Sequence, residues 1–200
     1  MKLRLIPFTW AASATLATAE GTDGHTSPNG KYFYEYHEAL PHESNVRFLN
    51  TKTGKQIGLG FSYGYEPESF LETKWSHDSS YLAVIVRGTR TTAHLVVYHF
   101  EGDMVTMVDL PDFQLNLLGR RNLIEGGRYQ WCKNLRWEDT TLTFHYTGQW
   151  KDGPGDPKID PDNWFYFDVS IRFGGKGSKA NAKLASVSKT SPLKNGVEGP

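Results

Sequence analysis

The sequence has almost no cysteine. Cys132 is the only one among 200 residues, so the chain cannot form an internal disulfide bond. Stability must therefore come from packing of the folded chain. Cys132 lies between Trp131 and Lys133 in a segment typical of a strand, with no second cysteine or histidine beside it. We expect a buried, unreactive thiol.

Net charge is also missing. The chain has 22 basic and 22 acidic residues, so its formal charge is zero. Proteins that bind nucleic acid normally carry a basic excess, and we therefore expect no nucleic-acid partner. The mostly apolar run at residues 5–16 is too short to cross a bilayer as a helix, and we expect no membrane span.

The first 19 residues have the features of a secretory signal peptide. Lys2 and Arg4 form a positive start, residues 5–16 are mostly apolar, and residues 17–19 form an Ala-Thr-Ala cleavage site. We therefore expect a periplasmic or secreted protein. The alternative is an apolar N-terminal strand of a cytosolic protein.

Aromatic residues are abundant, at 14%, and 20 glycines and 10 prolines accompany them. Aromatic residues favour strands, while glycine and proline mark the turns between strands. Residues 75–86 show the pattern best, with an aromatic residue, a polar turn and then a continuous apolar run. Weaker copies lie at residues 27–36 and 137–146, and Ser27 and Ser76 are 49 positions apart. A continuous apolar run predicts a strand that is buried on both faces.

Other segments extend the same pattern. We read residues 60–73 as a connection, and residues 113–121 are compatible with one short helix after Pro111-Asp112. The prediction is an all-β, mostly antiparallel domain at residues 27–189, followed by a disordered tail at 190–200. Strands are expected at residues 32–37, 46–50, 56–59, 81–87, 94–100, 104–110, 128–134, 142–146, 164–173 and 182–187.

The turn sequences resemble a known repeat. Ser27-Pro-Asn-Gly-Lys-Tyr and Trp75-Ser-His-Asp-Ser-Ser-Tyr-Leu-Ala-Val are similar to the Trp-Ser-Pro-Asp-Gly-Lys-x-Leu-Ala-Phe repeats of TolB-type β-propellers. His77 replaces the proline in the second copy, and the third copy is shortened. The layout also resembles small exported bacterial proteins that carry such repeats. The resemblance implies three propeller-blade-like units in an open or incomplete propeller, since closed propellers have four to eight blades. It implies no catalytic residue, because these repeats are scaffold motifs.

One predicted loop concentrates carboxylates at Asp152, Asp156, Asp160 and Asp162. Carboxylate oxygens at short spacing can hold calcium, so Asp156, Asp160 and Asp162 are candidate ligands, although their spacing does not match an EF-hand loop. Each of the four also neighbours a glycine or proline, where an aspartate can brace a turn. Asp152 and Asp162 are alternatively a candidate carboxylate pair for glycan hydrolysis.

Aromatic side chains are the other candidate binding feature. Tyr63, Tyr65, Trp150 and Trp164 fall in or beside predicted loops. Such side chains can bind sugars or peptides, and they can also cap the ends of a core. We expect a non-catalytic binding or scaffolding module of the bacterial envelope, without a cofactor, that contacts a protein or glycan through these loops. The alternatives are a glycan hydrolase that uses the Asp152–Asp162 loop and a purely structural homo-oligomer in which two chains close a ring.

Overall fold

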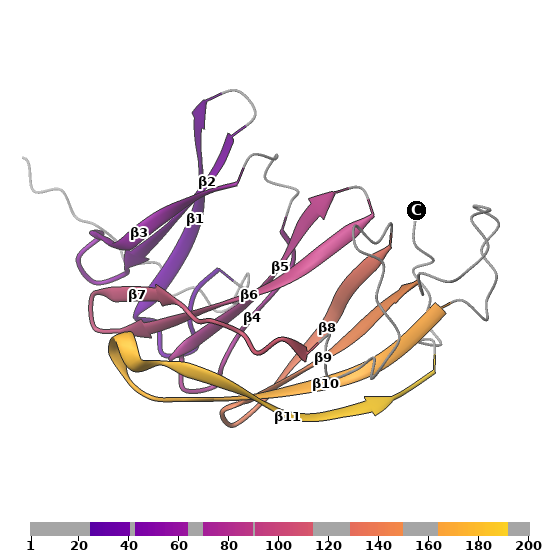
Figure 1. Ribbon diagram of the computed structural model, residues 1–200. Coiled ribbons are helices and arrows are strands. Elements are labelled where there is room, and N and C mark those ends of the chain that lie inside the picture. The colour runs from indigo at the N-terminus through magenta and orange to yellow at the C-terminus, as the bar shows by residue number, and fades with distance from the viewer. Residues whose placement is uncertain are drawn as a thin grey trace, which may run out of the picture.

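The chain folds as a succession of strands. The computed structural model describes residues 25–40, 43–63, 70–89, 91–113, 129–149 and 164–191. Within these ranges it contains eleven strands and one short 3-10 turn (Figure 1). They are β1 (Tyr32–Leu40), β2 (Glu43–Asn50), β3 (Gln56–Tyr63), β4 (Phe70–Trp75), β5 (Tyr81–Thr89), β6 (Thr92–Glu101), β7 (Met104–Met107), β8 (Gln130–Glu138), β9 (Thr141–Gln149), β10 (Trp164–Gly174), η3 (Gly177–Lys179) and β11 (Asn181–Lys189).

The strands form two sheets, a three-stranded sheet in the order β1-β2-β3 and an eight-stranded sheet in the order β11-β10-β9-β8-β6-β5-β4, in which β7 also pairs with β6. Along the chain they make three consecutive antiparallel groups (Figure 1). We call them the first unit (β1–β3), the second unit (β4–β7) and the third unit (β8–β11). Within a unit, each strand pairs antiparallel with the next. A single parallel residue pair, Thr92 with Gln130, joins β6 to β8. The predicted all-β, mostly antiparallel fold is therefore confirmed.

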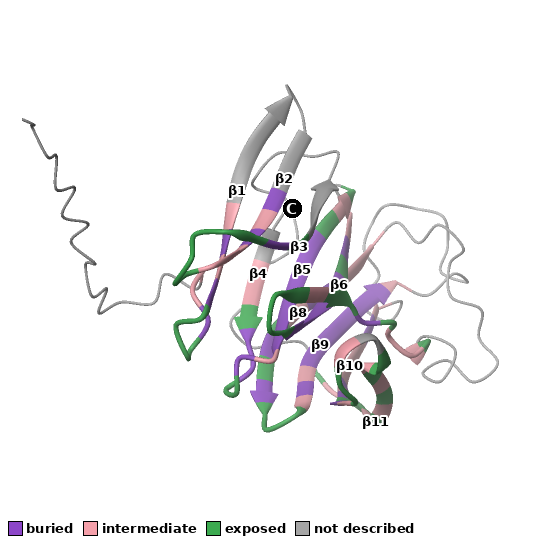
Figure 2. Cartoon of the chain, turned by 90° about the vertical axis from the view of Figure 1, so that its left-hand side faces the viewer, coloured by how far each residue is buried: buried purple, intermediate pink, exposed green. Residues whose placement is uncertain are grey.

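Strand β5 is buried on both faces. Every residue from Tyr81 to Val86 is at most 5% exposed, and Figure 2 draws most of this strand as buried. The odd-numbered side chains Tyr81, Ala83 and Ile85 pack in a cluster with the third unit. The even-numbered side chains from Leu82 to Val86 pack in a second cluster with the first unit. The double burial predicted for this strand is confirmed, and it places the second unit between the other two.

A serine-based turn leads into β5. Ser76 Oγ accepts a hydrogen bond from Tyr81 N–H (2.9 Å) and donates one to Asp78 Oδ1 (2.7 Å). Ser76 is fully buried, and Ser79 adopts a positive φ of 62°. The carboxylate of Asp78 also accepts the backbone N–H of Ser80 (3.0 Å). These bonds satisfy the backbone groups that the turn would otherwise leave unpaired.

The same turn leads into β1. Ser27 Oγ accepts from Tyr32 N–H (3.0 Å) and donates to Asn29 Oδ1 (3.0 Å). Gly30 takes the positive φ, at 67°. The two turns also touch, because Asn29 N–H donates to Ser79 Oγ (3.0 Å). The spacing of 49 residues seen in the sequence thus corresponds to two structurally equivalent turns in contact.

An aromatic trio packs the first unit on the second. The rings of Tyr32 and Trp75 stack with centroids 6.3 Å apart and an interplanar angle of 15°. Phe100 lies 5.0 Å from Tyr32 and 4.8 Å from Trp75. All three are buried.

An equivalent trio packs the second unit on the third. The rings of Tyr81 and Trp137 stack at 5.8 Å and 24°, and Phe173 lies 5.1 Å from Tyr81 and 5.3 Å from Trp137. Offset aromatic pairs at these distances stabilise beyond their buried area, by about 0.5–1.5 kcal/mol each. The chain therefore uses one aromatic contact twice.

The trio does not continue outward. Trp75 and Phe100 belong to the second unit, and the residues 49 positions before them, in the first unit, are Thr26 and Thr51. The third unit has a shorter turn at residues 139–140, where Asp139 has a φ of 49°, and Thr141 takes the tyrosine position. Threonine has no aromatic ring. The first and third units therefore lack, at these equivalent positions, the side chains that could form another trio with a further unit.

A carboxylate also ties the second unit to the third. Glu72 Oε2 accepts the backbone N–H of Asn134 and Glu72 Oε1 accepts that of Leu135, both at 2.7 Å. These N–H groups lie where the β8–β9 register shifts between Lys133 and Arg136, and Asn134 has a φ of 67°. Glu72 thus supplies the acceptors that the β-ladder leaves out at this bulge.

Some predictions need correction. Residues 70–73, predicted as part of a connection, belong to β4, and residues 60–63 belong to β3. The sequence of β4 has little alternation, but its pairing with the buried strand β5 makes it a strand. Strand β7 ends at Met107, before the predicted residue 110.

Other predictions lie largely outside the described residues. Only Phe113 of the predicted helix is described, and the signal peptide at residues 1–19 is not. Of the predicted tail, Thr190 donates its N–H to Tyr166 O (2.9 Å), and residues 192–200 are not described. In the described part of the chain, no helix has the length and apolarity needed to cross a membrane.

Candidate functional site

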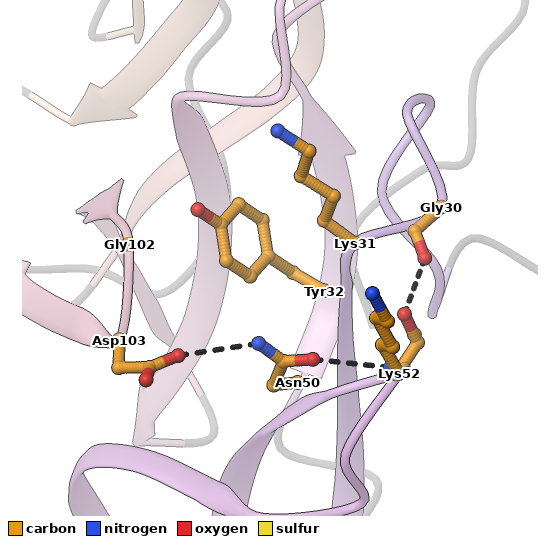
Figure 3. A pocket seen from close by; sticks show the side chains of 8 residues that line it. Gly30, Lys31, Tyr32, Asn50, Lys52, Gly102 and Asp103 are labelled. Carbon is orange, nitrogen blue, oxygen red and sulfur yellow. Dashed lines mark hydrogen bonds between the residues drawn. The ribbon is translucent and has the colours of Figure 1, made fainter.

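Three turns from two units surround a cavity of about 350 Å³ (Figure 3). The first turn precedes β1, the second joins β2 to β3, and the third joins β6 to β7. The cavity therefore lies at the turn-bearing end of the junction between the first and second units. Its lining consists of Gly30, Lys31, Tyr32, Asn50, Thr51, Lys52, Gly102 and Asp103.

Asn50 organises the lining. Its Oδ1 accepts the backbone N–H of Lys52 (3.0 Å) and of Thr53 (3.3 Å), which fixes the turn after β2. Its Nδ2 donates to Asp103 Oδ1 (3.2 Å) and so connects that turn to the second unit. The Thr51 hydroxyl donates to Gly30 O and ties the first turn to the second. Asparagine suits this position because its amide supplies both an acceptor and a donor.

Tyr32 forms the floor of the cavity. Its ring belongs to the aromatic trio and is 7% exposed, while its side chain projects toward the Gly102–Asp103 turn (Figure 3). Burial raises the pKa of the Tyr32 phenol, and the carboxylate of Asp103 raises it further. The hydroxyl therefore stays protonated at neutral pH and can donate a hydrogen bond to a ligand.

The charges around the cavity are unequal. Lys31 and Lys52 are exposed and cationic, and Asp103 is the single acidic side chain in the lining. Asp103 already accepts a hydrogen bond from Asn50. The arrangement can therefore bind a small polar group with a negative charge, with two ammonium groups beside it and a phenol below.

Of the sequence-predicted site residues, only Trp164 has a described side chain, and it is not among the residues that line this cavity. Tyr63 is the last residue of β3, and its side chain is not described. Trp164 begins β10, is half-buried and has its ring 5.8 Å from that of Tyr129. The others lie outside the described residues, namely Tyr65, Trp150, Asp152, Asp156, Asp160 and Asp162. Calcium binding by Asp156, Asp160 and Asp162 remains a prediction.

Sequence reasoning identified the three turns but not the cavity between them. Residues 51–55 and 101–103 lie between strands that the sequence predicts, and both form hairpin turns. What joins them is the spacing of 49 residues, which sets equivalent turns of neighbouring units at the same end. The 49-residue spacing is therefore the sequence signal from which the position of the cavity could be predicted.

Two reactive-looking features have structural explanations. Cys132 is 3% exposed, so its predicted burial is confirmed, and this burial raises the pKa of its thiol to about 12. Residues 60–64 spell Gly-Phe-Ser-Tyr-Gly, which matches the Gly-x-Ser-x-Gly pattern. Ser62 lies inside β3 and pairs with Asn45 of β2, whereas a nucleophile elbow requires a turn from a strand into a helix.

Among the described residues, no three His, Cys, Asp or Glu side chains gather in a way that could hold a metal ion.

No family model, no curated protein and no solved structure matches this chain.

Proposed function

We propose that this chain is a non-catalytic binding or scaffolding module of the bacterial envelope, periplasmic or secreted once residues 1–19 are removed. Its three units would be propeller-blade-like repeats in an open array. The repeated serine turn and the repeated aromatic trio support this reading, because both recur with the same contacts. The partner would be an envelope protein or glycan.

The observation that carries the binding proposal is the cavity between the first two units. It places Lys31, Lys52 and the Tyr32 hydroxyl around one hollow, at the junction of two rigid sheets. Loops positioned by a rigid scaffold are common binding sites. We therefore propose that the cavity binds an anionic group of the partner, such as a carboxylate of an acidic peptide or glycan.

A capture experiment from envelope extract tests this proposal. The full chain is compared with Lys31→Gln/Lys52→Gln and with Trp150→Ala/Trp164→Ala. Lys55→Gln is the matched control, because Lys55 is exposed on the same hairpin and does not line the cavity. We expect the double lysine variant to lose the captured partner and the control to retain it. Equal capture by all variants, or turnover in a hydrolase panel that is lost when Asp160 or Asp162 is changed, would contradict the proposal.

The open array also bears on the oligomer alternative. A ring closed by the same contact would need a tyrosine at Thr141, and a tryptophan and phenylalanine at Thr26 and Thr51. We therefore expect a monomer by light scattering. A stable dimer would favour the structural oligomer instead.

A further inference from the structure

The cavity between the first two units is electrically polarised. Lys31 and Lys52 belong to turns of the first unit, whereas Asp103 belongs to the β6–β7 turn of the second unit. Two positive charges and one negative charge leave the lining with a formal charge of +1. All three side chains are exposed, so a ligand can reach them from solvent. The ligand that complements this charge is a monoanion.

Asp103 restricts which monoanion can bind. Its Oδ1 accepts a hydrogen bond from Asn50 Nδ2 (3.2 Å), and its Oδ2 makes no hydrogen bond to the described residues. A carboxylate only accepts hydrogen bonds, so a ligand that occupies the cavity must bring a donor to Oδ2. A ligand that carries only negative groups would instead place a like charge against Asp103.

The other polar groups of the lining are donors. Beside the two lysines, Asn50 has used one of the two N–H groups of its amide, and the Tyr32 hydroxyl has a proton to donate. Burial raises the pKa of Tyr32 and the carboxylate of Asp103 raises it further, so the hydroxyl lies close to that carboxylate. Figure 3 shows the phenol beside Gly102, and Asn50 between Asp103 and Lys52. Donors therefore surround a single acceptor.

Three classes of anion can be compared with this pattern. A phosphate monoester carries between one and two negative charges near neutral pH and exceeds the charge of the lining. An acidic peptide brings further carboxylates, which would approach Asp103 and the adjacent Glu101. A uronic acid residue has one carboxylate and several hydroxyls on the same ring, and each hydroxyl both donates and accepts. Of the three, the uronic acid matches both the charge and the acceptor.

We propose that the cavity binds a uronic acid residue of an acidic glycan. This inference rests on the proposed function, since it takes the cavity as the binding site and adds the chemistry of the partner. The carboxylate of the ligand lies toward Lys31 and Lys52, and a ring hydroxyl donates to Asp103 Oδ2. The bound residue therefore bridges the three-stranded sheet and the eight-stranded sheet. A cavity of about 350 Å³ is at the small end of ligand sites, as one sugar residue requires.

Titrations of the ¹⁵N-labelled full chain, followed by NMR at low salt where charges are least screened, test the proposal. The probes are glucuronate, galacturonate, cyclohexanecarboxylate, which has the ring and the carboxylate without hydroxyls, and methyl glucoside, which has hydroxyls without the carboxylate. We expect at least one uronate to shift the Asn50 side-chain signals with a saturable response. It should bind at least about tenfold more tightly than the other two probes, because each of them lacks one kind of contact. Lys31→Gln/Lys52→Gln should lose this binding, and Lys55→Gln should retain it.

Asp103→Asn isolates the contact with the hydroxyl. The new amide keeps an acceptor for Asn50 but places an NH₂ group, a donor, where Oδ2 was. For cyclohexanecarboxylate the change only removes a repulsion, so its affinity should stay the same or rise. The uronate also loses the acceptor of its hydroxyl, so the preference for uronate over cyclohexanecarboxylate should fall about tenfold. Asp109→Asn is the matched control, because Asp109 is exposed and does not line the cavity, and should leave the preference unchanged.

The outcomes separate this inference from the proposed function. Equal, lysine-dependent binding of uronate and cyclohexanecarboxylate, or an unchanged preference in Asp103→Asn, would overturn the uronic acid proposal and leave the anion-binding cavity in place. Tighter binding of N-acetylglutamate α-amide, which carries the single carboxylate of an acidic peptide residue, would overturn it in favour of a peptide. If no carboxylate binds at up to about 50 mM, or if binding survives in Lys31→Gln/Lys52→Gln, the cavity proposal fails and this inference fails with it.

Discussion

The carboxylate of Glu72 is expected to hold the second and third units together. It accepts two backbone N–H groups of β8 at 2.7 Å, from Asn134 and Leu135. Hydrogen bonds to a charged group contribute about 1.5–3 kcal/mol each. Glu72→Gln keeps the size of the side chain but turns an NH₂ group toward one of the two donors. It therefore loses one bond and weakens the other, and we expect a loss of about 2 kcal/mol in the free energy of unfolding.

For a chain of this size, 1 kcal/mol shifts the melting temperature by about 2–4 °C, so the expected decrease is about 4–8 °C. Urea denaturation followed by circular dichroism should give the same loss as a lower midpoint with an unchanged slope. Glu72→Asp should be destabilised as well, because the shorter side chain keeps the charge but does not reach both donors.

Glu35→Gln is the matched control. Glu35 Oε1 lies 3.1 Å from Arg47 Nη2, and both side chains are 36% exposed. Exposed ion pairs contribute at most about 1 kcal/mol, so this variant should lose well under half as much stability as Glu72→Gln. Equal losses in the two variants would refute the reasoning, because the connection between the units would then not depend on the bulge.

Three further outcomes are expected. Ser76→Ala removes the acceptor of the Tyr81 N–H and should lower the free energy of unfolding by about 2 kcal/mol. An unchanged urea midpoint would show that Ser76 does not stabilise the turn before β5. Burial lowers the pKa of His99 and of His145, so the unfolded chain takes up protons first as the pH falls below about 6.5. Stability should therefore be full above pH 6.5 and decline below it, and replacing either histidine by glutamine should flatten the decline seen in denaturation at a series of pH values. Burial raises the pKa of Cys132 to about 12, so iodoacetamide at pH 8 should label it only in urea, and rapid labelling of the folded chain by mass spectrometry would disagree.

Much of the strand pattern could be predicted because it depends on near neighbours in the chain. Alternation around Tyr32 and the apolar run from Tyr81 to Val86 gave β1 and β5, and their turn residues marked where they begin. Residues of β4 such as Glu72 carry no such pattern. They form a strand because their backbone pairs with that of β5, and no local pattern in the sequence indicates this pairing.

The candidate sites were harder to predict, since they join residues that are distant in the sequence. Asn50 meets Asp103 because two equivalent turns of neighbouring units come to the same end. His145 Nδ1 lies 3.3 Å from Asp168 Oδ1 on the neighbouring strand, a partner 23 residues away in the sequence. The Nε2 of His145 makes no hydrogen bond to any described residue, which depends on the side chains that β8 and β10 place beside it.

By itself, then, the sequence determined the class of the fold, the position of most strands and the turns that repeat at 49 residues. These follow from side-chain alternation and backbone preferences, which act over a few residues. Only the tertiary structure decided that the second unit lies between the other two, that the described residues form the aromatic trio twice, and that Asn50 meets Asp103 beside the cavity. Those features depend on contacts between units, where packing and hydrogen bonding over long sequence distances select one arrangement.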